Sequence, residues 1–141
     1  MTMKHIAHIF LALTLMLSVS GVAQSQTIRN ENYSTIGRID NDGTVRDSNN
    51  STIGRINSNG DIRDRNNHFL GKIGSNGEIR NSNNSLLGKV ENNGTVRNSN
   101  NSALGSVSSD GVVRDSNYHV IGYAKGVPMT YVAVYFFFNM F

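Results

Sequence analysis

The stretch STIGRIDNDGTVRDSNN, residues 34–50, decides the fold, because the chain repeats it with a period of 17 residues. Glycine, arginine and asparagine recur at this spacing over six copies, a register that chance does not produce. The three series are Gly37, Gly54, Gly71, Gly88, Gly105 and Gly122; Arg29, Arg46, Arg63, Arg80, Arg97 and Arg114; and Asn32, Asn49, Asn66, Asn83, Asn100 and Asn117. The chain is therefore expected to be a repeat protein built from one small unit.

Each copy contains two short strand-like pieces, residues 34–39 and 44–47 in the first complete unit, separated by a loop rich in Asn, Asp and Gly. This pattern predicts a β-hairpin. A three-residue loop at 41–43 pairs Ile39 with Val45 and places both aliphatic side chains on one face, whereas a two-residue turn separates them. We therefore expect the three-residue loop, with its glycine in the left-handed region of backbone conformation.

Two further positions in the unit have a conformational meaning. Either a bulge at Gly37 brings Ile36 and Ile39 to the same face, or the missing side chain lets another backbone approach closely. The second turn of the unit is expected at Asn49 and Asn50, because asparagine tolerates left-handed backbone angles better than most residues.

Hairpins this short are not stable alone and must stack or close on one another. Residues 27–30 form a second strand without its first, and residues 119–122 form a first strand without its second. Pairing of these two segments closes a ring, whereas an open stack leaves both as exposed edges. We therefore favour a closed all-β ring over residues 27–124, with either five petals plus a closing pair or six-fold symmetry.

A different composition begins after Pro128, where residues 131–141 are nearly all apolar. The β-branched and aromatic content favours a strand over a helix, so residues 125–141 are expected to form an apolar C-terminal strand that packs on or in the repeat domain. The alternatives are a strand that pairs with another subunit, and hence self-association, or an outer-membrane sorting signal. Each unit has only about three aliphatic side chains to offset an ordering cost of ~1.5 kcal/mol per residue. The repeats therefore need further apolar side chains, which favours a tail that belongs to the core or to a subunit interface.

The N-terminal segment has the pattern of a signal peptide over residues 1–23. A single lysine precedes a short apolar run at residues 9–19, and small residues follow it. Cleavage is expected after Ala23, with Ser25 as the second choice; an N-terminal anchor is the alternative. The chain has no cysteine, which excludes a lipoprotein anchor and disulfides. We therefore expect export to the periplasm, the outer-membrane surface or the extracellular space.

Composition and motifs give little indication of chemistry. Without residues 1–23 the chain has 12 basic and 10 acidic side chains, a balance that does not indicate nucleic acid as a partner. No catalytic, phosphate-binding or metal-ligand spacing is present, and identical repeats lack the mixed acid, base and nucleophile of an enzyme. The two histidines of the repeat region, His68 and His119, lie three repeats apart. No enzymatic activity, cofactor or metal is therefore expected.

The six repeated arginines, which we call the arginine rung, are next to the expected core position and should face outward. They are the candidate ligand-binding residues, because a ring of guanidinium groups suits a glycan or a cell-surface polyanion. Arg38, Arg55, Lys72 and Lys89 form a second, incomplete basic series. The alternative, favoured by the regular Arg-Asp and Arg-Asn dipeptides, is that the rung pairs with Asp47, Asp64, Asp115 and Asn carbonyl groups between neighbouring petals. The rung consists of Arg29, Arg46, Arg63, Arg80, Arg97 and Arg114.

The units STIGRI at 34–39 and TVRDSNN at 44–50 resemble those of the bacterial five-fold β-flower proteins. So does the ending IGYAKGV at 121–127, followed by AVYFFF at 133–138. The resemblance covers about residues 27–141. It implies a small exported protein with hairpin petals around an axis, and it brings neither an established activity nor catalytic residues. We therefore expect a structural or interaction role, with glycan or polyanion binding as the alternative.

Overall fold

The structure, a computed structural model, describes residues 26–141, so the expected signal peptide and both cleavage positions lie outside the described residues. Within this part of the chain, twelve strands precede one short helix. The strands are β1 (Gln26–Asn30), β2 (Thr35–Ile39), β3 (Thr44–Asp47), β4 (Thr52–Ile56), β5 (Asp61–Asp64), β6 (Phe69–Ile73), β7 (Glu78–Asn81), β8 (Leu86–Val90), β9 (Thr95–Asn98), β10 (Ala103–Val107), β11 (Val112–Asp115) and β12 (Val120–Tyr123); the helix is α2 (Met129–Phe137).

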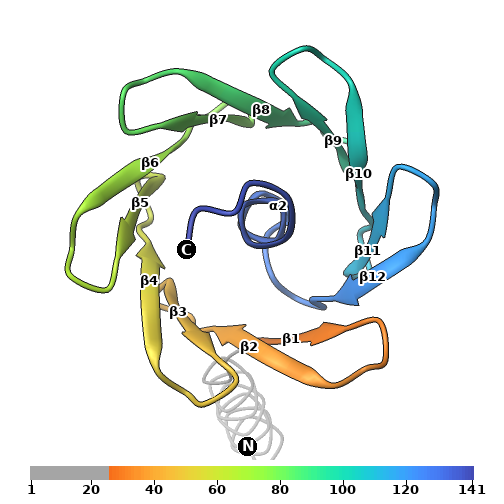
Figure 1. The fold of residues 1–141 in the computed structure, drawn as a ribbon, viewed down its shortest axis with the longest axis horizontal. Helices are drawn as coiled ribbons and strands as arrows, with labels where there is room; N and C mark the ends of the chain where they lie inside the picture. Colours follow the sequence, from red (N-terminus) through yellow and green to blue (C-terminus); the bar gives the residue numbers. More distant parts are fainter. Residues whose placement is uncertain (1–25) are drawn as a thin grey trace, which may run out of the picture.

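The strands pair antiparallel in chain order and close into a barrel, because β12 pairs with β1. Asn30 lies opposite Gly122 and Arg29 opposite Tyr123 in this closing pair. The prediction that the two unpaired ends of the repeat close a ring is therefore confirmed. Five hairpins, β2–β3 to β10–β11, and the closing β12–β1 pair make up six two-stranded units. Turns at the outside join neighbouring units into six petals, β1–β2 to β11–β12, around α2 (Figure 1).

The local predictions for the hairpin are also confirmed. Ile39 lies opposite Val45, and the loop between them is closed by a hydrogen bond from the Gly43 N–H to the Asp40 carbonyl oxygen at 2.9 Å. Gly43 has a φ of +89°, and Asn50 in the second turn has a φ of +66°. The two turns thus have the same kind of geometry, with glycine in one and asparagine in the other at the left-handed position.

The core is a ring of aliphatic side chains on the inner face of the strands. Each unit places one residue from its first strand and one from its second on this face, and Ile28, Val45, Ile62, Ile79, Val96 and Val113 are completely buried. Ile39, Ile56, Val90, Val107 and Ala124 are also buried, while Ile36, Ile53, Leu70, Leu87, Leu104 and Ile121 are partly buried and pack against them. The barrel wall is therefore apolar on its inside all the way round.

The prediction of a C-terminal strand is wrong, because the tail forms α2 in the middle of the ring (Figure 1). Every strand of the closed barrel already has a neighbour on both sides. A strand on the axis would leave its backbone N–H and C=O groups unpaired, whereas a helix pairs them internally. The surrounding wall also suits a helix that is apolar on all sides. Val132, Ala133 and Val134 are completely buried there. No helix of residues 26–141 is long and apolar enough to cross a membrane.

The repeated glycine of each first strand faces the tail. A Cβ atom built on Gly88 would lie 2.7 Å from Phe138 Cε1 and even closer to the carbonyl oxygen of Arg97. The strand also bulges next to this position, because pairing with the preceding strand skips Ile36. A different tail side chain meets each of the six glycines: Tyr135 at Gly37, Phe136 at Gly122, Phe137 at Gly105, Phe138 at Gly88, Met140 at Gly71 and Phe141 at Gly54. Each repeat therefore receives one side chain of the non-repeated tail.

Candidate binding surfaces

The arginine rung lies on the outer face of the ring, as the alternation along β3 requires. Val45 is completely buried, and Arg46 next to it keeps 28% of its side-chain surface exposed. Each rung arginine donates a hydrogen bond from Nη1 to the carbonyl oxygen of the residue four positions later, at 3.0–3.4 Å. That residue, Asn50 in the first complete unit, has the positive φ in the second turn, which we call the outer turn. Each rung arginine therefore stabilises, by a hydrogen bond, the outer turn that follows its own strand.

The acidic partners of the rung differ from those expected. Arg46 Nε lies 2.9 Å from Asp40 Oδ2, and Arg63 Nη2 lies 3.6 Å from Asp61 Oδ2. Asp47 instead accepts two backbone N–H groups of its own turn on Oδ1, from Asn49 at 2.9 Å and Ser51 at 3.0 Å. Asp64 and Asp115 make the same contacts. These three carboxylates are therefore used by the turn, and the expected pairing of the rung with them is wrong. Four rung arginines do contact an Asn carbonyl oxygen, but within one outer turn and not between neighbouring petals.

Four units place two cations directly opposite each other on the outer face. The second basic series faces the rung across the strands, as Arg38–Arg46, Arg55–Arg63, Lys72–Arg80 and Lys89–Arg97. Like charges in this position repel, and each of these four units has one acid against its rung arginine: Asp40, Asp61, Glu78 and Glu91, respectively. Asp40 also forms an ion pair, without hydrogen-bond geometry, with Arg38 Nε at 3.1 Å.

The other two units lack this arrangement. Arg114 faces Ser106 and Arg29 faces Tyr123, so neither arginine has a cation opposite it. Among residues 26–141, neither forms an ion pair with a carboxylate. The placement of acids thus follows the placement of facing cations from unit to unit.

Hydrogen bonds in the turns also perturb the carboxylates. The backbone N–H of His68 is the main cause of a lowered pKa at Asp64, and the N–H of Thr44 has this effect on the pKa of Asp42. Asp42 also lies 3.1 Å from Arg55 Nη2. Both carboxylates are exposed acceptors that hold loops in place, and both are charged at neutral pH.

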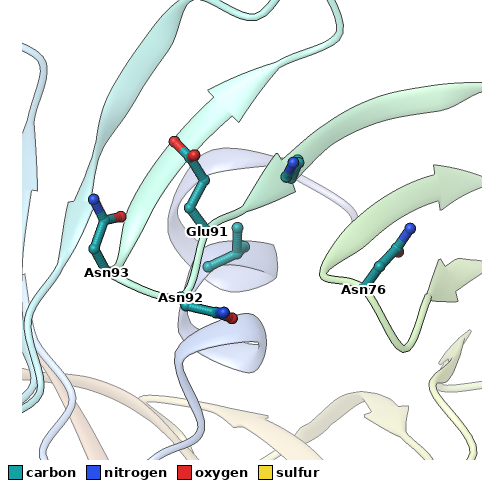
Figure 2. A pocket seen from close by; sticks show the side chains of 6 residues that line it. Asn76, Glu91, Asn92 and Asn93 are labelled. Atoms are coloured by element: carbon teal, nitrogen blue, oxygen red, sulfur yellow. The ribbon is translucent and has the colours of Figure 1, made fainter.

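A second candidate surface is the end of the ring where α2 begins. A recess of about 650 Å³ lies between two hairpin loops and the first residues of the helix, and Asn76, Asn92 and Met129 are among its lining residues. An adjoining hollow of about 400 Å³ has Asn76 on one loop and Asn92 and Asn93 on the next (Figure 2). Across the ring, a recess of about 530 Å³ contains Tyr131. These hollows are lined by amide side chains together with charged ones, Lys89 and Glu91 on one side of the ring and Asp42 and Arg55 on the other.

Residues 26–141 contain no group of three His, Asp or Glu side chains that could hold a metal ion. His68 Nδ1 lies 3.1 Å from Asp64 Oδ2, and His119 Nδ1 lies 3.6 Å from Asp115 Oδ2. Both contacts stay within one turn and involve well-exposed imidazoles. The histidines are therefore turn neighbours of an aspartate.

A family model described as 5-fold beta-flower protein matches residues 25–140. The chain belongs to the β-flower family. Searches of curated proteins and of solved structures gave no match. In this β-flower chain the described ring has twelve strands, and therefore six two-stranded units, although the family's description counts five.

Two tyrosines were not recognised as candidate residues from the sequence. Tyr33 and Tyr118 occupy the left-handed position of the outer turn, with φ of 67° and 66°, where the other four petals of this β-flower have asparagine. They are 62% and 80% exposed. The sequence does contain a signal for them, because each interrupts an otherwise constant asparagine in the 17-residue register.

Proposed function

We propose that this β-flower protein is exported and acts without catalysis, as a structural or interaction module of the periplasm, the outer-membrane surface or the extracellular space. The observation that carries the proposal is the use of the repeated polar side chains by the fold itself. Arg46 donates a hydrogen bond to a carbonyl oxygen of the outer turn, Asp47 accepts two N–H groups of the same turn, and the equivalent residues do so around the ring. Fractionation of cells that express the full chain, with mass spectrometry of the product's N-terminus, tests export; retention of uncleaved chain in the cytoplasm contradicts it.

Replacing Arg46 with Ala is expected to lower the free energy of unfolding by about 1–2 kcal/mol, because two hydrogen bonds and a partly buried ion pair are lost. Arg55→Ala is the matched control. Its guanidinium is more exposed and pairs with Asp42 on the surface, so a change below about 0.5 kcal/mol is expected. Urea denaturation measures both. Equal stability of Arg46→Ala and the wild type would contradict a structural role for the rung.

A second candidate function, binding of a glycan or polyanion, is supported by the facing cations of the outer face. Four units there have two cations opposite each other with one acid against the rung arginine, although Arg55 also pairs with Asp42. The remaining two rung arginines form no ion pair among the described residues. This function predicts binding on a glycan array that weakens with salt. The same Arg46→Ala protein distinguishes the two candidates, since loss of array binding at unchanged stability favours the second.

A further inference from the structure

The ring departs from its own symmetry at two adjacent petals. The left-handed position of the outer turn is occupied by asparagine in the β3–β4, β5–β6, β7–β8 and β9–β10 petals, but by Tyr33 in β1–β2 and Tyr118 in β11–β12. Bulky side chains are rare at a positive φ, because the Cβ atom approaches the backbone. Strain of this kind at an exposed position is a recognised indication of function.

Packing does not account for these tyrosines. Tyr118 is 80% exposed, and no ring or cation contact holds it within the described residues. Tyr33 meets Tyr123 edge-on, with ring centroids 5.1 Å apart, and the guanidinium of Arg29 lies 4.6 Å from the centre of its ring. Both side chains nevertheless present most of their surface to water, and this exposed part gains nothing from apolar burial.

The two petals lie side by side at the closure of the ring, β12 against β1 (Figure 1). Tyr123 lies at the end of β12, five residues after Tyr118, a separation of at most about 17 Å in an extended chain. The ring contact to Tyr33 continues this path across the closure. Tyr118, Tyr123 and Tyr33, which we call the closure tyrosines, thus form a track that follows β12 and continues across the closure.

The charge beside this track differs from that of the other petals. Arg29 and Arg114 are the rung arginines that form no ion pair within the described residues. Of the nearby carboxylates, Asp115 accepts turn N–H groups, and Asp110 accepts the Ser108 hydroxyl and has its pKa lowered mainly by that hydrogen bond and in part by Arg114. Glu31 is exposed in the same outer turn as Tyr33. The closure therefore combines exposed aromatic faces with guanidinium groups available to an incoming carboxylate.

We propose that the closure of the ring binds an acidic oligosaccharide. The C–H faces of its sugar rings pack on the closure tyrosines, and its carboxylates contact Arg29 and Arg114. Three tyrosine rings are too few for a protein interface, which buries roughly 800 Å² per partner. The proposal rests on the second candidate function and restricts it to one site per ring.

The test uses the full chain and measures affinity for tetragalacturonate by calorimetry. Tyr118→Asn, which introduces the residue of the four other petals, is expected to weaken binding at least tenfold while the melting temperature stays equal or rises. Tyr118→Phe is expected to keep the affinity within about threefold. Leu86→Thr removes another exposed apolar side chain, far from the closure in the ring order, and is expected to change nothing.

Each other outcome overturns the proposal. Equal affinity of Tyr118→Asn and the wild type, with weaker binding by Arg46→Ala, places the ligand along the rung and leaves the second candidate function standing. Equal affinity for the methyl-esterified tetramer removes the role of the carboxylates, and tighter binding of a tetraglutamate peptide changes the ligand class. If no acidic glycan binds the wild type, both the closure site and the second candidate function are wrong.

Discussion

Removal of residues 129–141 is expected to abolish soluble folding. The truncated chain loses α2, whose Val132 and Val134 are completely buried, and the aromatic side chains that meet the repeated glycines. Burial of one apolar side chain stabilises the fold by ~1.5–3 kcal/mol. Burial of five such side chains of the tail therefore contributes about as much as the ~5–15 kcal/mol free energy of unfolding of a whole domain. The remaining ring would also surround an empty axis lined by aliphatic side chains.

Far-ultraviolet circular dichroism and gel filtration of the truncated chain measure this effect. Asn139→Gly is a suitable control, because Asn139 is exposed, its side chain meets none of the repeated glycines, and glycine adopts its φ of +50° freely. Addition of a synthetic peptide of residues 127–141 is expected to restore the folded signal in part. A melting transition unchanged by the truncation would show that the tail is not part of the core.

The second large effect is expected for Gly88→Ala, at about 3 kcal/mol of destabilisation. The added methyl group would lie 2.7 Å from Phe138 Cε1 and in collision with the Arg97 carbonyl oxygen, which belongs to the paired strand and cannot rotate away. Overpacking of this kind forces side chains and backbone to shift. A fall of roughly 10 °C or more in melting temperature should accompany it in a chain of this size.

Gly74→Ala is the matched control for this substitution. A Cβ atom at Gly74 meets the side chain of Asn76 at 3.1 Å and a carbonyl oxygen at 3.5 Å, and the equivalent positions 40, 57, 91 and 108 have aspartate, asparagine, glutamate and serine. A change below about 0.5 kcal/mol is expected. Similar melting temperatures for the two variants would indicate that the tail does not reach the repeated glycines.

The repeat predicted much of the ring because its determinants are local. The need to place Ile39 and Val45 on one face selects the loop length, and the glycine and asparagine positions match the two left-handed turns. Ring closure followed from the two unpaired ends of the repeat. In each case a pattern of a few neighbouring residues has one geometric solution.

The tail could not be predicted in the same way, since its conformation depends on the ring around it. Residues 131–138 have strand-like composition, yet a strand on the axis has no partner, and backbone pairing outweighs propensity. The sequence also indicates the wrong acidic partner for Arg46. Asp47 is adjacent in sequence, but its side chain is occupied by two turn N–H groups, so the arginine pairs with Asp40 across the hairpin.

Nuclear Overhauser effects between the tail and the repeated glycines test the central claim, that one tail side chain reaches each repeat from inside a closed ring. A mixture of chains labelled in phenylalanine and chains labelled in glycine separates contacts within one chain from contacts between chains. The structure predicts intrachain effects from Phe136 to Gly122, Phe137 to Gly105 and Phe138 to Gly88. Absence of these effects, or their occurrence only between chains, would contradict a ring closed around its own C-terminal helix.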